Sequence, residues 1–272
     1  MYNEYPDLIY EGLISDSLYT DIIEEGLGES IKNKFGKIRT MFKTFINKVI
    51  EKWNWLISKM KQGINKIKDK IRKKKNNSGE NNTNSDNKGK STETKKQFGT
   101  LKYKFKNKDY IKDFEEEYDK ALRVIKALFD GGDSNELDKF DDPEYNNFPK
   151  NMNELIDKLI DVEAYTKDEL YIIESEEEMN RILNLKPEKY ISIVQELSAA
   201  NDSLEEFIES SFSEPSSSDG EKSQVDEITN RVMASTKQKF TTINKYLNYV
   251  TYYATLIVQQ IQSFNIEGRS EK

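Results

Sequence analysis

The sequence predicts an all-α protein, with a long basic amphipathic helix, a flexible linker and a C-terminal helical bundle. Apolar residues recur every three or four positions over long stretches, which is the spacing of helices with one buried face. Residues 76–96 contain no apolar side chain and therefore predict a linker. With 35% hydrophobic and 33% charged residues in a chain of 272, long exposed helices are favoured over one compact core.

The chain contains neither cysteine nor histidine. Disulfides, thiolate or imidazole metal sites, and Ser–His or Cys–His catalysis are therefore excluded. Runs of glutamates occur, but consecutive helical residues point in different directions and do not converge as an acid–base pair. We expect no enzymatic activity, no cofactor and no metal. No apolar run reaches the length that crosses a bilayer, and the N-terminus does not resemble a secretory signal.

Charge is strongly segregated along the chain. Residues 1–29 carry eight acidic groups and no Lys or Arg, whereas residues 30–75 carry sixteen Lys or Arg and two acidic groups. We therefore predict an acidic leader at 1–29, a basic helix at 30–75, a disordered linker at 76–98 and an acidic helical domain at 99–272. Segregation of this kind indicates different partners for different segments.

The basic helix has the clearest pattern in the chain. Its apolar residues follow one another at steps of three or four, close to the α-helical period and unlike the strict 3.5-residue repeat of a left-handed coiled coil. Ser30 is a suitable N-cap, and a helix of this length would be about 65 Å long. Lysines are expected on the opposite face. The apolar stripe consists of Ile31, Phe35, Ile38, Phe42, Phe45, Val49, Trp53, Leu56, Met60, Ile64, Ile67 and Ile71.

The same reasoning predicts the remaining elements. A short helix is expected at 7–26, and 101–105 is expected to be a short strand or an extended lead-in. Residues 213–223 read as a second flexible loop. Further helices are expected at 110–129, 151–163, 166–184, 187–212 and 224–265.

Three tetrapeptides near the N-terminus share a branched aliphatic residue, any residue, a glutamate and then a small residue. Only roughly 0.7 such tetrapeptides would be expected by chance in the whole chain, so three within the first 30 residues are informative. A fourth, at 172–175, lies in a predicted helix and is interpreted as incidental. The three bonds in question are Glu11–Gly12, Glu25–Gly26 and Glu29–Ser30.

This pattern resembles the recognition sequence of the prohead protease of T-even-type tailed phages. The resemblance implies a phage internal head protein, which enters the prohead by its N-terminal segment and is then trimmed by the protease. The protein would pass from the host cytoplasm into the capsid and remain there with packaged DNA and other capsid or core proteins. Cleavage after Glu29 or Glu25 is favoured over Glu11, and cleavage after Glu29 leaves residues 30–272 at a net charge of +1.

The basic helix has three interpretations. It binds DNA phosphates without sequence preference, it lies on a membrane surface with Trp53 and Trp55 at the interface, or its stripe packs on another helix and its lysines are solvated. The acidic leader could equally neutralise the helix without being cut. Alternatives to an internal head protein are a membrane-active protein and a prohead scaffold component. The candidate DNA- or membrane-binding cations are Lys32, Lys34, Lys37, Arg39, Lys43, Lys48, Lys52, Lys59, Lys61, Lys66, Lys68, Lys70, Arg72, Lys73, Lys74 and Lys75.

Overall fold

The computed structural model describes a set of helices and one small sheet. The acidic leader, with its three candidate cleavage bonds and its expected helix at 7–26, lies outside the described residues, as do residues 80–97 of the predicted linker. Of the loop predicted at 213–223, residues 213–221 also lie outside them, and residues 222–223 belong to a helix. The described residues are 31–79, 98–101, 103–129, 148–149, 151–161, 171–173, 176–212 and 222–267.

The described chain is mainly helical, which confirms the predicted all-α class. Three short strands form an antiparallel sheet in the order β2-β1-β3. In chain order, the elements are α3 (Ile31–Gly79), β1 (Phe98–Leu101), α4 (Tyr110–Phe129), α6 (Met152–Leu159), β2 (Tyr171–Ile173), α8 (Glu176–Asn184), the 3-10 helix η2 (Pro187–Tyr190), α9 (Ile191–Phe212), α10 (Lys222–Ser263) and β3 (Asn265–Glu267).

Several predicted boundaries are close to the observed ones. Helix α4 has the predicted bounds, and α3 has the predicted start but continues to Gly79, so the first four residues of the predicted linker are helical. Pro187 starts the 3-10 turn that precedes α9, because proline has no backbone N–H to donate and its φ suits the first turn of a helix.

The prediction of one helix over 166–184 is correct for 176–184 and wrong for 171–173. Residues 171–173 form strand β2, and helix α8 begins only at Glu176. The sequence Tyr-Ile-Ile has high β-propensity and pairs with β1, so tertiary pairing overrides the helical periodicity. Strand β1 also begins earlier than the expected 101–105, and Phe105 instead forms an isolated bridge with Ile160.

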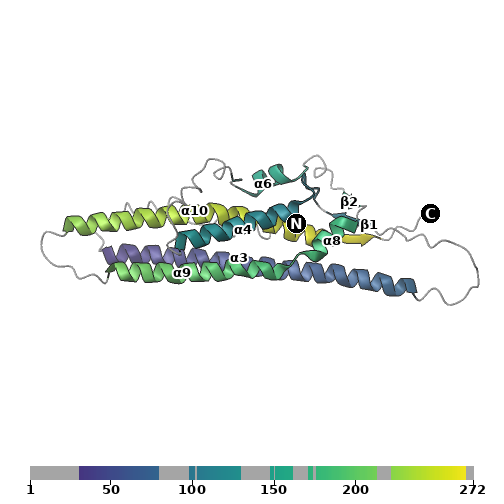
Figure 1. Ribbon diagram of the computed structural model, residues 1–272, viewed down its shortest axis with the longest axis horizontal. Coiled ribbons are helices and arrows are strands. Elements are labelled where there is room, and N and C mark those ends of the chain that lie inside the picture. Colours follow the sequence, from purple (N-terminus) through teal and green to yellow (C-terminus); the bar gives the residue numbers. More distant parts are fainter. Residues whose placement is uncertain are drawn as a thin grey trace, which may run out of the picture.

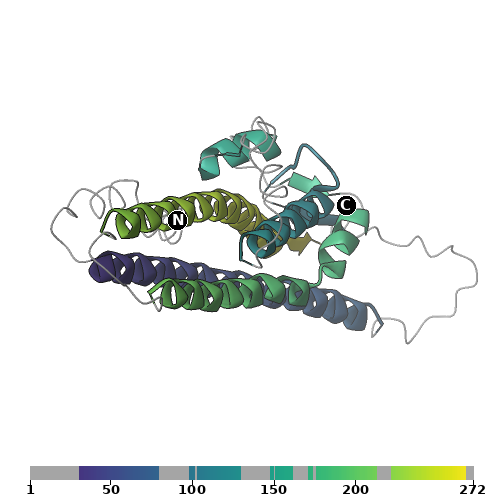
Figure 2. The same cartoon turned by 60° about the vertical axis from the view of Figure 1, so that its left-hand side comes forward.

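Two layers of helices build the body of the molecule. Figures 1 and 2 both place α3 and α9 side by side, with α10 and α4 forming the second layer and α6 outside it. The C-terminal end of α3 projects past the start of α9 in both views. The molecule is therefore elongated, and one end of the basic helix extends beyond the helix that covers it.

The apolar stripe of α3 lies in the same core as the helices of the acidic domain. The side chains of Trp53, Leu56 and Met60 have no solvent exposure, and they belong to one hydrophobic cluster with residues of α4, α9 and α10. The prediction of a basic helix separate from the acidic helical domain is therefore wrong. The stripe indicated a buried face, but the sequence alone could not show which distant residues cover it, such as Tyr118 of α4 and Thr251 of α10 against Trp53.

Helices α3 and α10 run parallel, in a constant register. The indole Nε1 of Trp53 donates to Thr251 Oγ1 at 3.1 Å, a pair 198 positions apart in the chain. Further along both helices, Gly63 faces Ile261, which gives the same offset. A Cβ at residue 63 would collide with the Ile261 side chain, so glycine allows the two backbones to approach closely at this point.

Two buried polar side chains of this core, Gln260 and Tyr253, form hydrogen bonds to the backbone. Gln260 is almost fully buried, and its side-chain amide both accepts from the backbone N–H of Tyr103 and donates to the Tyr103 carbonyl, at 3.0 and 2.8 Å. The hydroxyl of Tyr253 donates to the Tyr110 carbonyl at 2.8 Å. These bonds attach the segment that precedes α4 to the end of α10, and they satisfy groups that would be costly to bury unpaired.

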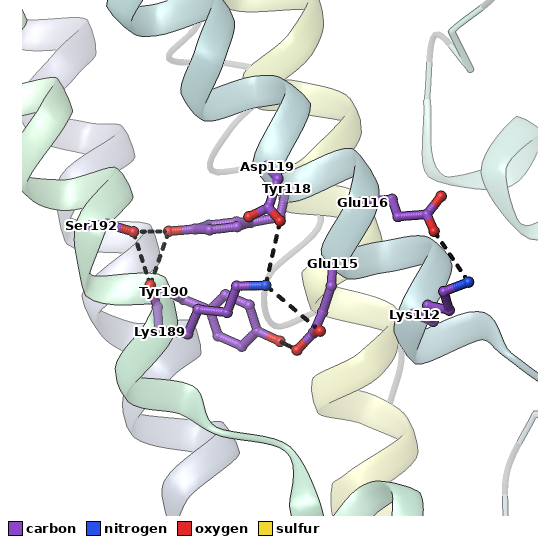
Figure 3. A network of polar contacts seen from close by, with 8 residues as sticks. All are labelled: Lys112, Glu115, Glu116, Tyr118, Asp119, Lys189, Tyr190 and Ser192. Carbon is purple, nitrogen blue, oxygen red and sulfur yellow. Dashed lines mark hydrogen bonds and ion pairs between the residues drawn. The ribbon is translucent and has the colours of Figure 1, made fainter.

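A polar network joins α4 to the beginning of α9 (Figure 3). The Tyr118 hydroxyl accepts from the backbone N–H of Ile193 at 3.1 Å and lies 2.7 Å from Ser192 Oγ. Lys189 lies within 3.6 Å of the carboxylates of both Glu115 and Asp119. Tyr118 thus serves as an N-cap supplied by another helix, since the first N–H groups of a helix have no partner within it.

Candidate functional site

The main chemical feature of the described surface is the basic character of α3. Among the α3 side chains that the structure describes, eleven are Lys or Arg and two, Glu51 and Asp69, are acidic. The apolar stripe is buried in the bundle, so these cations surround a helix whose remaining faces are open to solvent. Such a helix attracts anions over a distance that depends on ionic strength.

Six of these cations form one line along the helix, here called the α10-side lysine row. At 100° per residue they fall within a strip about 60° wide, beside the apolar stripe. The strip extends over about 37 Å at 1.5 Å per residue, and its last members lie against the end of α10. The row consists of Lys48, Lys52, Lys59, Lys66, Lys70 and Lys73.

A second group lies on the other flank of the stripe, here called the η2-side lysine row. It consists of Lys43, Lys61, Lys68 and Arg72, and within it Lys61 and Lys68 border η2. Lys61 Nζ lies 3.3 Å from a carboxylate oxygen of Glu188. The pKa of Glu188 is lowered, first by a hydrogen bond from its own backbone N–H and then by Lys61.

The face of α3 opposite the stripe carries neutral polar side chains and the two acidic residues Glu51 and Asp69, contrary to the expectation that lysines occupy it. Thr40, Thr44, Ser58 and Gln62 lie there and are exposed. The two threonine hydroxyls donate to backbone carbonyls four residues earlier, and Gln62 donates to Ser58. The positive charge is therefore divided between two flanks, because long lysine stems can cover apolar surface while their ammonium groups reach water.

A hollow of about 570 Å³ lies where the α10-side lysine row meets the end of α10. Its rim carries lysines, and its floor is apolar. It is here called the α10-side hollow, and it is lined by Lys59, Gln62, Gly63, Lys66, Ile67, Asp69, Lys70, Lys73, Ile261, Gln262 and Phe264.

A smaller hollow of about 360 Å³ lies on the other flank of the same stretch of α3. It combines Lys61 and Lys68 with Lys186 and the carboxylate of Glu188. The Lys61–Glu188 ion pair neutralises part of its charge. Of the two hollows, the α10-side one is therefore the more strongly positive.

The two tryptophans differ in their position. Trp53 is fully buried and donates to Thr251, so the expectation that it contacts DNA or a membrane is wrong for the folded protein. Trp55 is half-buried, with the ammonium groups of Lys52 and Lys59 at 4.4 and 5.8 Å from its ring. Partial burial lowers the pKa of Lys52.

The structure places most of the predicted cations on the two flanks. Arg39, Lys43, Lys48, Lys52, Lys59, Lys61, Lys66, Lys68, Lys70, Arg72 and Lys73 are half-buried or exposed. The side chains of Lys32, Lys34, Lys37, Lys74 and Lys75 lie outside the described residues, as do the cleavage bonds at Glu11, Glu25 and Glu29.

Sequence reasoning missed the part of the α10-side hollow that α10 supplies. Ile261, Gln262 and Phe264 are distant in sequence, and nothing in their own pattern indicates that they face α3. Gly63 was the available signal, because a glycine inside a helix costs about 1 kcal/mol relative to alanine and so indicates a packing reason.

Other kinds of site are not found in the part of the chain that the structure describes. It contains no group of three or more Asp or Glu residues placed to hold a metal ion. None of its helices combines the length and the apolar character that crossing a membrane requires.

The comparisons with known proteins are negative. No family model matches the chain, and neither the curated proteins nor the solved structures include a significant match. Functional interpretation therefore depends on the residues themselves.

Proposed function

We propose that this protein is a structural, non-enzymatic protein that associates with DNA through the basic flanks of α3, and that it is an internal protein of a phage head. The observation that carries the first part is the arrangement of α3. Its apolar stripe is buried, while lysines lie along both flanks. The N-terminal Glu–Gly and Glu–Ser motifs support the second part, through their resemblance to prohead protease sites.

The charge arrangement suits a polyanion better than a specific small ligand. Lysine is a flexible point charge that can meet phosphates at many positions, and contacts of this kind carry no sequence information. Outside the bundle core, the described α3 surface offers one half-buried aromatic residue, Trp55, so base stacking along the row is a minor contribution.

Burial of the apolar stripe is an argument against membrane binding as the main activity. An interfacial helix inserts its apolar face into the lipid, but here Trp53 and Leu56 have no exposed surface. Membrane insertion would therefore require α3 to leave the bundle. DNA binding requires no such change.

A salt titration with duplex DNA tests the proposed association. The affinity of the full chain should fall linearly with salt on logarithmic axes, by a slope of about 0.9 per phosphate contacted. Residues 30–272 should bind more tightly, since the acidic leader contributes eight negative charges. Binding that does not change with salt and is equal for the full chain and residues 30–272 would contradict the proposal. Leakage of dye-loaded liposomes without DNA binding would contradict it as well.

Substitutions identify the surface that is used. Replacing Lys48, Lys66 and Lys68 by Gln should lower the salt slope by about 2.7, if each lysine contacts one phosphate. The matched control replaces Lys108, Lys112 and Lys158, which are also exposed but lie away from α3. The same loss of slope in the control would show that the flanks of α3 are not the binding surface.

Mass spectrometry of the protein from its native particle tests the placement in a phage head. The expected N-terminus is Ser30 or Gly26. An intact Met1, or the absence of the protein from mature particles, would contradict this part of the proposal. A protein that is degraded before maturation would instead be a scaffold component.

A further inference from the structure

The α10-side hollow differs from the rest of the basic surface in three respects. It is concave, it has an apolar floor, and it gathers lysines from successive turns of α3 on one rim. Its volume of about 570 Å³ falls within the range of about 300 to 1,000 Å³ that is typical of small-ligand pockets. A continuous rod of duplex DNA would touch its rim but would not fill it.

We infer that the α10-side hollow binds one or two nucleotide units of an unpaired nucleic-acid strand, with phosphates on the lysine rim and a base against the apolar floor. The inference rests on the proposed function for the choice of nucleic acid as the polyanion. It adds to that function a discrete site and a preference for single strands at this site.

The rim supplies the charge that such a ligand needs. Lys59, Lys66, Lys70 and Lys73 lie on one side of α3 at steps of seven, four and three residues, so their ammonium groups are about one or two helical turns apart. Asp69 is the one acidic residue among those that line the hollow. The net charge of the lining is therefore strongly positive, and successive phosphates of a flexible strand can meet successive lysines.

The floor supplies a surface for a base. Ile67, Ile261 and Phe264 are buried below the rim, and Gln62 and Gln262 provide amide groups at its edge. Gly63 creates the floor, because the absence of a side chain lets Ile261 of α10 come directly against α3. Burial of apolar surface is non-directional, so contact with this floor accepts any base and adds to the phosphate attraction without reading sequence.

Isothermal titration calorimetry of the full chain at low salt tests the inference, with a thymidine tetranucleotide as the probe. An abasic tetramer with the same number of phosphates is the ligand control. We expect the thymidine tetramer to bind about tenfold more tightly, since a base in contact with the floor adds to the phosphate term. Equal affinities for the two tetramers would overturn the inference.

Two matched double variants test the location. Lys66→Gln with Lys73→Gln removes two exposed rim charges, and Lys108→Gln with Lys112→Gln removes two exposed charges that lie away from α3. The rim variant should lower the salt slope for the tetranucleotide by about 1.4, at about 0.7 per contact for single strands. The control variant should leave that slope unchanged, and equal effects of the two would overturn the inference.

Asp69→Asn is expected to raise affinity, an effect that a folding defect could not produce. Removal of the carboxylate beside the rim should raise the affinity for the tetranucleotide several-fold, and an unchanged or lower affinity would count against the site. Duplex binding is measured in parallel. If duplex binding persists while the tetranucleotide fails to bind, the inference fails and the proposed function stands. Tetranucleotide binding without duplex binding would support the site and contradict the proposed association with duplex DNA.

Discussion

Trp53 of α3 donates its indole N–H to the hydroxyl of Thr251 on α10, at 3.1 Å, and both side chains are buried in the core. The bond fixes the register of two parallel helices, although the two bonded residues are 198 positions apart in the sequence. It also gives a partner to the indole N–H, the only polar group of this large buried side chain. Burying that N–H without a hydrogen bond would cost about 1 to 3 kcal/mol.

A double-mutant cycle should measure this bond. Thr251→Val removes the acceptor but keeps the shape, and it should lower the free energy of unfolding by about 1 to 3 kcal/mol because the indole N–H remains buried. Trp53→Phe should cost at least as much, since it also leaves a cavity. The double variant should be less destabilised than the sum of the two, as measured by urea denaturation. Strict additivity would show that the bond contributes nothing.

The helix predicted at 31–75 agrees closely with the observed α3, Ile31–Gly79, because its signal is local. Steps of three or four between apolar residues depend only on the helix itself, so the stripe around Trp53 can be identified without knowledge of its partners. Its partners could not be predicted, because contacts such as Trp53–Thr251 depend on long-range packing. The strand at 171–173 was missed for a related reason, since pairing with β1 decides its conformation.

The candidate site shows the same division. The eleven described cations of α3 could be read from the sequence, but their separation into two flanks follows from how the stripe is buried. The α10-side hollow could not be predicted, because Ile261 and Phe264 reach α3 only through the parallel packing of α10. The expectation that the basic helix is separate from the acidic helical domain arose from the linker between them. A flexible linker, however, does not prevent the two segments that it joins from packing together.

Two glycines of α3 should respond in opposite ways to the same substitution. Gly63→Ala places a Cβ against the branched side chain of Ile261, so we expect a loss of about 1 to 3 kcal/mol of stability. Gly36→Ala is the matched control, because no atom lies within 4 Å of its Cβ position. There the gain in helix propensity should stabilise by up to about 1 kcal/mol.

Thermal and urea denaturation would measure both effects. A third variant, Ile261→Ala combined with Gly63→Ala, should be less destabilised than the sum of the two single variants, because the shorter side chain at 261 removes the collision. If Gly63→Ala stabilised the protein as Gly36→Ala does, the close approach of α3 and α10 at this position would be contradicted.

Tyr118→Phe should weaken the attachment of α4 to α9. The substitution keeps the ring but leaves the N–H of Ile193 without the hydroxyl that caps it, so we expect a loss of about 1 to 2 kcal/mol. Ser198→Ala serves as a control, because the Ser198 hydroxyl is exposed and bonds only to a carbonyl of its own helix. Hydrogen exchange should show faster opening of the first turn of α9 in the Tyr118 variant. Unchanged protection of Ile193 would mean that the cap is not formed.

The buried tyrosines should make the protein sensitive to alkali. Burial raises the pKa of Tyr118 to about 12, above its usual value near 10, and it raises the pKa of Tyr190, Tyr249 and Tyr253 as well. Below about pH 10 each phenol is protonated in both states and its contribution to stability is complete. Between about pH 10 and pH 12 the unfolded state loses these protons first, so stability falls as pH rises.

Urea denaturation across this range, with tyrosinate absorbance followed in parallel, measures the effect. Tyr118→Phe should reduce the steepness of the decline, because it removes one of the groups responsible. Lys52 acts in the opposite direction, since its pKa is lowered in the folded state, but it is one group against four. Constant stability up to pH 12 would contradict burial of these phenols.

Packing of α3 into the acidic domain predicts that the chain unfolds as one unit. A fragment of residues 97–272, which lacks α3, would expose the faces of α9 and α10 that now cover Trp53, Leu56 and Met60. The free energy lost with this buried apolar surface exceeds the usual free energy of unfolding of a domain. We therefore expect the fragment to lack a cooperative thermal transition, to bind a hydrophobic dye and to aggregate. The full chain should show a single transition by circular dichroism and by Trp fluorescence. A fragment that melts cooperatively at the temperature of the full chain would restore the view that α3 is a separate module.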